Sequence, residues 1–425
     1  MANQKLTDLS ELGTVADDDF CYIIDTSDTT DGANGSSRKA QAKNIRGWPK
    51  TAAETSAGVT PTAYQFAPGD VRRYGAVGDD STDNLTAINN AITVMNTGGG
   101  GEVFIPEGIF QSTDTIVMKS NVHLRGEGSK SILKLANSAV GNLDTTTGDP
   151  AFVLAKSASF FKISNLAIDG NDANNSTLFN NLVTSLCTDF QIFHIEQNNA
   201  YGSAYQALTC SEFQLTGWYI HEITGASGNP GEGLYIRKCN NWTISDMLGV
   251  DLDDHLIYLS GTTTTQTVDG VITNCVGTNC GRTSNSSAFN ALDGVRRVTL
   301  SNCHAYDCKR GFTIIGTADG TEDISYIGCT AYNCDDATSP TGFSISSASD
   351  NHQRIRYVGC KAYKSGMATA SAAGYGFNIQ DADDVSLFNC EGSLSNYDGF
   401  YADDVTKLRV IGGSFRSNGE EPSVT

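Results

Sequence analysis

The segment ITNCVGTNC at 272–280 is followed by four similar segments, which are LSNCHAYDC at 300–308, YIGCTAYNC at 326–334, YVGCKAYKS at 357–365 and LFNCEGSLS at 387–395. Each segment has an apolar residue, any residue, Asn or Gly, and then Cys, with Cys or Ser five positions later. The first cysteine recurs at steps of 28, 26, 31 and 30 residues. A period of 20–50 residues is typical of solenoids, propellers and other repeat arrays.

The content of each repeat favours a parallel β-helix. The repeats hold short alternating strands separated by Gly, Asn, Asp and Ser, and none has ten residues of helical periodicity. A propeller blade needs about 40 residues. The same frame runs from Leu166 through Ile195, Trp218 and Met247 to Gly413, with a mean step of about 27 residues. Three short strands per coil fit this length, and such coils stack at about 4.8 Å.

A second strand column supports the same frame. It consists of GLYI at 233–236, LIYL at 256–259, AFNA at 288–291, GFTI at 311–314, GFSI at 342–345, GFNI at 376–379 and GFYA at 399–402. The second and fourth positions are apolar and are expected to point inward, because strand side chains alternate. The third position is expected to point outward, giving the row Tyr235, Tyr258, Asn290, Thr313, Ser344, Asn378 and Tyr401.

The N-terminal part has a different organisation. Residues 83–97 place Leu85, Ile88, Ile92 and Met95 at helical spacing, so we expect a capping helix with Asp83 as its N-cap. Such a helix covers the open first coil of a solenoid. The segments 20–25 and 38–43 predict a small hairpin within a separate unit at 1–47, and residues 48–69 are expected to be a linker before a β-helix domain at 70–425.

The charge balance argues against several kinds of partner. There are 28 Lys and Arg residues against 48 Asp and Glu residues, a formal net charge of −20. This excess repels phosphate and anionic lipid, so we expect no nucleic-acid binding and no membrane insertion. No apolar run approaches the ~18 residues of a transmembrane helix. The N-terminus shows no secretory signal, which favours assembly in a reducing cytoplasm.

The cysteines have three possible interpretations. Cys275 and Cys280 form one of three Cys-x4-Cys pairs, a spacing that allows a zinc site, yet zinc needs four converging ligands. Because the spacing follows the coil period, a buried stack of thiols explains it better, and we expect no metal and no cofactor. A disulfide between neighbouring coils is also geometrically open.

Several segments resemble the start of the pectate-lyase-like superfamily of right-handed parallel β-helices. They are DVRRYGAVGDDSTDNLTAINNAI at 70–92, GGGGEVFIPEGIF at 98–110, NVHLRGEG at 121–128 and ISNLAIDGN at 163–171. The stretches at 5–28 and 51–76 are similar to phage tailspikes and tail fibres. The resemblance implies a homotrimeric tailspike depolymerase, with residues 1–47 bound to other virion tail or adaptor proteins. It also implies assembly in the bacterial cytoplasm, residence in the virion, and a β-helix that binds or cuts host surface polysaccharide.

This sequence departs from the family pattern in three ways. Asp253 and Asp254 are not followed by the Gly-His-Gly of polygalacturonases, and no pectate-lyase-like calcium pattern is present. The chain also ends soon after Gly413, where tailspikes usually continue with further coils and a trimerisation part. A short member, a truncated chain and a spike capped by other means all remain open.

Stacking brings an acidic and aromatic patch together. Residues that precede the second strand column form the row Glu232, His255, Ser287, Arg310, Thr341, Tyr375 and Asp398, with Asp253 and Asp254 beside His255. Glycoside hydrolysis needs two carboxyl groups, ~5–5.5 Å apart for retention or ~6.5–9.5 Å apart for inversion. We expect Glu232 to be the acid and Asp254 the base or nucleophile, with Asp253 and His255 as further catalytic candidates. The substrate-binding candidates are Tyr235, Tyr258, Asn290, Arg282 and Arg310.

Other functions fit the same residues. A polysaccharide lyase needs a base and a neutralising charge, for which His255 or Tyr258 with Arg282 or Arg310 would serve. A non-catalytic receptor-binding spike would use the same groove, and a structural tail protein would use the coil only as a rigid spacer. The simplest alternative is that the acids are solvated turn residues, because Asp is common in turns.

Overall fold

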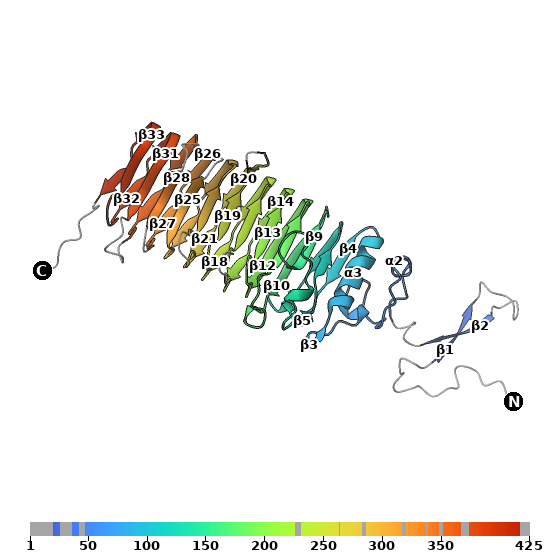
Figure 1. Cartoon of the computed structure of the whole chain (residues 1–425). Helices are drawn as coiled ribbons and strands as arrows, with labels where there is room; N and C mark the ends of the chain where they lie inside the picture. Colours follow the sequence, from blue (N-terminus) through green and yellow to red (C-terminus); the bar gives the residue numbers. More distant parts are fainter. Residues whose placement is uncertain are drawn as a thin grey trace, which may run out of the picture.

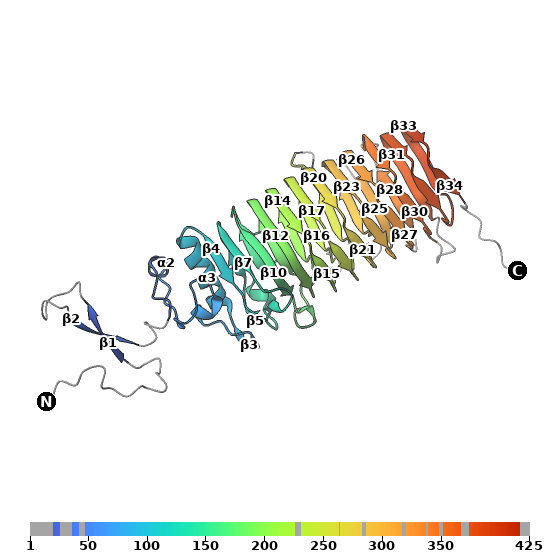
Figure 2. The same ribbon diagram turned by 180° about the vertical axis from the view of Figure 1, so that it is seen from behind.

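The protein is a long parallel β-helix in a computed structural model of the whole chain (Figure 1, Figure 2). The structure describes residues 20–25, 36–41, 47–225, 231–262, 264–282, 286–316, 320–336, 339–347, 352–366 and 374–416. The chain winds through three parallel sheets, here called A, B and C, and each strand pairs with its equivalent on the next coil. None of the helices in these residues is long and apolar enough to cross a bilayer.

Sheets A and B follow each other on every coil. Sheet A contains β4 (Gly101–Phe104), β7 (Val122–Arg125), the first parts of β10 (Lys162–Asp169) and β12 (Thr188–Asn198), β14 (Ser211–Thr216), β17 (Asn240–Ser245), β20 (Thr267–Thr273), β23 (Val295–Ser301), β26 (Glu322–Ile327), β29 (Ile355–Val358) and the last parts of β31 (Tyr375–Phe388) and β33 (Phe400–Ile411). Sheet B contains β3 (Asp79–Asp83), β5 (Gly108–Ser112), β8 (Ser131–Leu135), the last parts of β10 and β12, β15 (Tyr219–His221), β18 (Leu248–Val250), β21 (Val276–Thr278), β24 (His304–Tyr306), β27 (Thr330–Tyr332), β30 (Lys361–Tyr363), β32 (Glu391–Ser393) and β34 (Ser414–Arg416).

Sheet C closes each coil. It contains β6 (Ile116–Met118), β9 (Ala151–Lys156), β11 (Asn180–Ser185), β13 (Tyr205–Leu208), β16 (Leu234–Arg237), β19 (Ile257–Ser260), β22 (Phe289–Leu292), β25 (Arg310–Gly316), β28 (Thr341–Ser347) and the first parts of β31 and β33. Its register pairs Tyr235 with Tyr258, Tyr258 with Asn290 and Asn290 with Thr313. The predicted register of this row is therefore confirmed, although Asn290, Thr313 and Ser344 in it are buried.

The first cysteine column is a stack along the axis. The backbone N–H that follows each cysteine donates to the carbonyl of the cysteine one coil earlier, so that His304 bonds Cys275, Thr330 bonds Cys303 and Lys361 bonds Cys329. Cys280 starts a separate stack with Cys308 and Cys334, and Cys187 starts a third with Cys210 and Cys239. These eleven thiols are free and buried. The Cys-x4-Cys spacing thus joins two different stacks and does not gather four ligands.

The Asn or Gly before each cysteine has a conformational cause. Asn274, Asn302 and Asn389 have φ values of 55°, 51° and 51°, and Gly328 and Gly359 have φ values of 62° and 61°. This left-handed region turns the chain sharply from sheet A to sheet B, and Asn and Gly occupy it at the lowest steric cost. The short turn between these two sheets is therefore encoded in every repeat.

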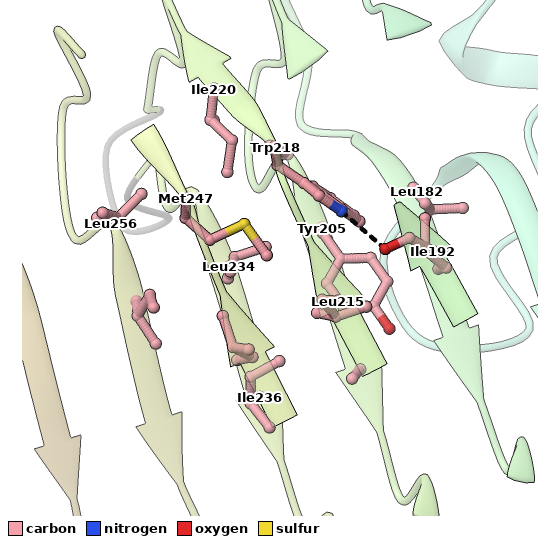
Figure 3. Close-up of a cluster of buried hydrophobic side chains, with 14 of the residues drawn as sticks. Leu182, Ile192, Tyr205, Leu215, Trp218, Ile220, Leu234, Ile236, Met247 and Leu256 are labelled. Carbon is pink, nitrogen blue, oxygen red and sulfur yellow. Dashed lines mark hydrogen bonds between the residues drawn. The ribbon is translucent and has the colours of Figure 1, made fainter. Parts of the chain in front are cut away.

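The core is apolar and layered. Phe289, Phe312, Phe343 and Phe377 stack along sheet C with ring centroids 4.7 to 4.8 Å apart. Figure 3 shows a section of the core nearer the N-terminus, where Trp218 Nε1 donates to the carbonyl of Ile192 at 3.0 Å. The inward positions of each coil thus bury aromatic and aliphatic side chains against the coil above and below.

The N-terminal end is closed by α3 (Leu85–Thr97), which contacts β4 and β6. It buries Ala87, Ile88, Ala91, Ile92 and Val94, whereas Leu85 and Met95 are only half-buried. The expected N-cap was one residue early, because Asn84 is the N-cap. Asp83 instead accepts a hydrogen bond from the Leu85 N–H at 3.1 Å. The capping helix is confirmed, and only its first residue and its buried face differ.

A buried ion pair holds the chain ahead of this helix. Residues 48–69, expected as a linker, contain α2 (Ala52–Ser56), and η2 (Val71–Tyr74) follows. Arg73 Nε lies 2.5 Å from Glu54 Oε1, and both side chains are fully buried. Arg73 also donates to the carbonyls of Trp48, Pro49 and Phe66. Burial alone would raise the pKa of Glu54, but hydrogen bonds from Arg73 and Thr51 lower it overall.

The remaining described elements are short. β1 (Phe20–Asp25) and β2 (Ser36–Gln41) form an antiparallel pair, with Phe20 opposite Gln41, as expected for a hairpin. The 3-10 helices η3 (Val140–Asn142) and η4 (Asp172–Asn174) lie in turns. The rest of residues 1–46, where we expected an attachment unit, lies outside the described residues.

Candidate active site

The acidic patch lies where the turns from sheet B enter sheet C. Glu232 lies just before strand β16, separated from it by Gly233, and Asp254 and His255 precede strand β19. The Asp254 N–H donates to the Gly231 carbonyl at 3.1 Å, and the Gly233 N–H donates to the His255 carbonyl at 2.8 Å. The two segments are therefore neighbours on adjacent coils, as the repeat frame predicts.

Glu232 is a buried carboxyl group with one strong hydrogen bond. Its side chain is 4% exposed, and Ser203 Oγ donates to Glu232 Oε2 at 2.6 Å. Burial, together with the nearby charge of Asp254, raises the pKa of Glu232 to about 8, although the Ser203 hydrogen bond opposes this rise. Glu232 is therefore mostly protonated at neutral pH and can donate a proton.

Asp254 and His255 form a second buried unit. Asp254 Oδ1 lies 3.3 Å from His255 Nε2, and the two residues are 4% and 6% exposed. His255 Nδ1 lies 2.6 Å from the Ser287 carbonyl oxygen. The Ser287 backbone N–H also donates to His255 Nδ1 at 3.1 Å. His255 Nε2 faces Asp254 Oδ1, so the imidazole and the carboxylate are direct neighbours within the buried patch.

Two tyrosines extend the patch toward solvent. Tyr235 and Tyr258 stack with centroids 5.0 Å apart and an interplanar angle of 17°. The imidazole ring of His255 stacks on Tyr258 at 5.0 Å. Burial raises the pKa of both phenols, so they stay neutral at physiological pH. Their half-buried faces form a flat aromatic platform beside the carboxyl groups.

Asn290 continues the row on the next coil. Its Nδ2 lies 3.3 Å from His255 Nε2, and its Oδ1 accepts from Thr313 Oγ1 at 2.9 Å. The structure therefore brings together six of the residues predicted from the sequence, which are Glu232, Asp254, His255, Tyr235, Tyr258 and Asn290.

The other three predicted residues are engaged elsewhere. Asp253 Oδ1 lies 2.7 Å from Arg282 Nη2, and Asp253 Oδ2 accepts the Gly225 N–H at 3.0 Å. Arg310 Nη2 lies 2.8 Å from the buried Asp336. Arg310 is also three coils beyond Glu232, which corresponds to roughly 14 Å at ~4.8 Å per coil. These residues can therefore contact only other parts of an extended ligand.

Sequence reasoning missed the polar residues on the coil before Glu232. Ser203 receives the Gln206 Nε2 hydrogen at 3.2 Å, and its own N–H donates to Asn180 Oδ1 at 2.9 Å. The strand YQAL at 205–208 is in register with LYIR at 234–237. Extending the second strand column by one coil would have aligned Gln206 with Tyr235 and placed Ser203 beside Glu232.

No cation site accompanies these groups. Among the described residues, no cluster of three or more His, Cys, Asp or Glu side chains could hold a metal ion.

A hollow lies on a different face, along the N-terminal part of sheet A. It has a volume of about 600 Å³, and its lining includes Phe160, Lys162, Gln191, Gln214 and Asn241. Phe160 is 63% exposed, which is unusual for a large aromatic side chain. Exposed aromatics beside side-chain amides suit a flat polar ligand, so this hollow is a second candidate binding surface.

The fold is thus a parallel β-helix with buried acidic side chains at the entry to sheet C. The sequence matches the family described as "Rhamnogalacturonase A/epimerase, pectate lyase-like" over residues 70–313, more than half of the chain. The protein therefore belongs to this pectate-lyase-like family, in agreement with the expected all-β right-handed parallel β-helix and its N-terminal capping helix.

Two relatives show how the sequence is related to other proteins. It is 26% identical over 264 residues to the pre-neck appendage protein of Bacillus phage phi29, covering 59% of this chain and 27% of that protein. It is 32% identical over 113 residues to the mannuronan C5-epimerase AlgE1 of Azotobacter vinelandii, covering 25% of this chain and 8% of the enzyme. The chain thus spans about a quarter of the length of its phage relative.

Solved structures share the fold at low sequence identity. The ORF18 protein of Geobacillus virus E2 matches with a TM-score of 0.56 and 16% identity, over 76% of this chain and 59% of that protein. The family 28 exopolygalacturonase of Yersinia enterocolitica matches with a TM-score of 0.58 and 12% identity, over 91% of this chain and 82% of that one. These likenesses establish the β-helix and carry no residue roles.

Proposed function

We propose that this protein is a phage tailspike that binds and cleaves a host surface polysaccharide by glycoside hydrolysis. The similarity to a phage appendage protein supports the setting, and membership of the pectate-lyase-like family supports the substrate class. The observation that supports the chemistry is the pairing of a protonated Glu232 with a neighbouring Asp254–His255 unit.

In the proposed reaction Glu232 donates its proton to the glycosidic oxygen as the bond to the anomeric carbon breaks. Asp254 either takes a proton from the attacking water or bonds the anomeric carbon, and then water completes the hydrolysis. In both routes one water is consumed and Glu232 regains a proton. His255 orients Asp254 through Nε2 and acts as a positioning residue, and Tyr235 and Tyr258 stack against a sugar ring.

The decisive experiment measures reducing ends released from host polysaccharide by Glu232→Gln and Asp254→Asn. We expect each variant to lose at least about 100-fold in rate, because acid or base catalysis typically supplies that factor. Glu232→Gln removes the acidic proton and Asp254→Asn removes the negative charge, and neither change alters the size of the side chain much, so the fold should persist. The exposed Glu107→Gln is the matched control and should keep full activity. Unchanged release by both site variants would refute the assignment.

Two other functions have separate signatures. A lyase on the same scaffold would produce unsaturated uronates, seen as a rise in ultraviolet absorbance. A non-catalytic receptor-binding spike is favoured by the hollow around Phe160, which lies away from Glu232. Tight binding without reducing ends, lost in Phe160→Ala and kept in Glu232→Gln, would select this second function. Absence of binding would leave a structural tail protein.

The remaining parts of the proposal concern assembly. We propose that residues 1–47 attach the spike to other tail proteins of the virion, that residues 48–69 lead into the β-helix domain at 70–425, and that three chains form a homotrimer assembled in the bacterial cytoplasm. Light scattering should give three times the mass of one chain. A monomer would count against the tailspike proposal.

A further inference from the structure

A second, smaller hollow lies on sheet A near the C-terminal end of the described coils. It has a volume of about 330 Å³ and lies over β26, β29, β31 and β33. The strand register places Ser325, Arg356, Ser386 and Arg409 in one row on four successive coils. Arg356 and Arg409 therefore flank Ser386, with one coil step of ~4.8 Å to each side.

The arginines of this face fall into two groups. Arg297 pairs with Asp269 at 2.6 Å, and Arg354 pairs with Asp323 at 2.6 Å and with Glu322 at 2.7 Å. In contrast, Arg356 and Arg409 form no ion pair or hydrogen bond with any residue that the structure describes. Both are exposed, and both line the hollow. The guanidinium groups of Arg356 and Arg409 thus remain available to a ligand, whereas those of Arg297 and Arg354 are neutralised by ion pairs.

This local charge is opposite to that of the whole molecule. The hollow also contains Asp384, which forms no ion pair within the described residues. Because Arg354 and Asp323 neutralise each other, the remaining charges are those of Arg356, Arg409 and Asp384, a local excess of one positive charge. The chain as a whole has a formal net charge of −20. A positive hollow on such a surface attracts a single anionic group more readily than a dense polyanion, which the negative surface around it repels.

We propose that this hollow binds an oxyanion between Arg356 and Arg409, above Ser386, and that the oxyanion is the carboxylate, sulfate or phosphate group of an acidic saccharide. Planar guanidinium groups bind such oxyanions through paired hydrogen bonds. Ser325 and Ser386 supply hydroxyl groups for the sugar. The saccharide source rests on the proposed function, whereas the oxyanion site does not. The site lies on sheet A and the acids lie at sheet C, so cleavage and anion binding can be measured separately.

The test is calorimetric titration of the full chain at low, constant ionic strength with a galacturonate oligomer, its carboxyl-reduced counterpart, sulfate and phosphate. We expect the galacturonate oligomer to bind and the reduced oligomer to bind at least about tenfold more weakly, since a charge-assisted hydrogen bond is worth that factor. Arg356→Gln and Arg409→Gln should each weaken binding by about tenfold. Asp384→Asn should strengthen it, because it removes the only unpaired negative charge of the hollow.

Arg297→Gln is the matched control, because it removes an equal charge from the same face but from a paired arginine. Its binding should match that of the unmodified protein, and Glu232→Gln should also bind normally even where cleavage is lost. Equal losses in Arg297→Gln and Arg356→Gln would mean general electrostatics and would overturn the site. Binding of the reduced oligomer at full strength, or no binding of any probe, would overturn it as well. Preference for free sulfate or phosphate over the oligomer would exclude the saccharide and retain only an anion site.

Discussion

At the scale of single residues, the burial of Glu232 has the clearest consequence, because it raises the pKa of this carboxyl group. The carboxyl is buried beside Asp254, and Ser203 is its hydrogen-bond donor. Activity that depends on a protonated Glu232 should fall as pH rises through about 8. In Ser203→Ala the hydrogen bond that lowers the pKa is lost, so the alkaline limb should move to higher pH. A pH–rate profile measures this shift. An unmoved limb would exclude Glu232 as the group that titrates.

The same pKa predicts how stability depends on pH, without any assumption about catalysis. In the unfolded chain Glu232 loses its proton above about 4.5, whereas in the folded protein it keeps the proton up to about 8. Between these values the unfolded state binds fewer protons, so stability falls as pH rises, by at most about 1.4 kcal/mol per pH unit from this group. Denaturant unfolding at several pH values should show that Glu232→Gln removes this contribution. An identical pH dependence in both proteins would contradict the buried, protonated carboxyl.

The sequence predicted which acidic and aromatic residues of the candidate site come together better than it predicted the surrounding ion pairs. Glu232 and Asp254 could be placed on neighbouring coils because His255 falls at the repeat position of Glu232 and Asp254 directly precedes His255. The ion pairs of Asp253 with Arg282 and of Arg310 with Asp336 depend on the turns between sheets B and C. These turns differ in length from coil to coil, so no periodicity encodes which way their side chains point.

At the scale of elements, the left-handed residue between sheets A and B controls each turn. Asn302 adopts φ of 51° and is followed by Cys303, and the equivalent position on the next coil is Gly328. Asn302→Ala should destabilise the protein by about 1 kcal/mol, because a Cβ without a hydrogen-bonding group is strained in this region. Asn302→Gly is the matched control and should be close to neutral. Denaturant unfolding would measure both, and a larger loss in the glycine variant would show that the side chain, rather than the backbone, matters.

The ends of the helices and strands are harder to predict from sequence patterns than the elements themselves. Strand alternation and the Asn/Gly-Cys turn predicted sheets B and C in the correct register. The helix was placed correctly, but Asp83 was expected as its N-cap, and Asp and Asn are about equally good at this position. Asn84 takes that position because its side chain bonds the backbone of Val77 at both its oxygen and its nitrogen. This contact comes from the fold around the helix and is not visible in the helix sequence.

At the scale of the whole molecule, the stability of a stack of coils depends on how its two ends are covered. Each internal coil pairs its backbone on both sides, but the first coil has a neighbour on one side only and needs a cover. That cover is α3 together with the preceding segment, which Arg73 ties down through Glu54 and three backbone carbonyls. Arg73, through its ion pair and hydrogen bonds to residues distant in sequence, thus holds residues 48–69, which were expected to be a linker.

This arrangement predicts that the cap is the most sensitive part of the chain outside the core. Glu54→Gln leaves the buried guanidinium of Arg73 without its counter-charge, and breaking a buried ion pair typically costs about 3–5 kcal/mol. We expect limited proteolysis to cut first within residues 48–69 in this variant, before the β-helix unfolds. The exposed pair of Arg297 and Asp269 offers the control, since Asp269→Asn should change stability by less than about 1 kcal/mol. If Glu54→Gln proved as resistant to protease as Asp269→Asn, the buried pair would not be what holds the cap. The first coil would then be closed by the apolar face of α3 alone.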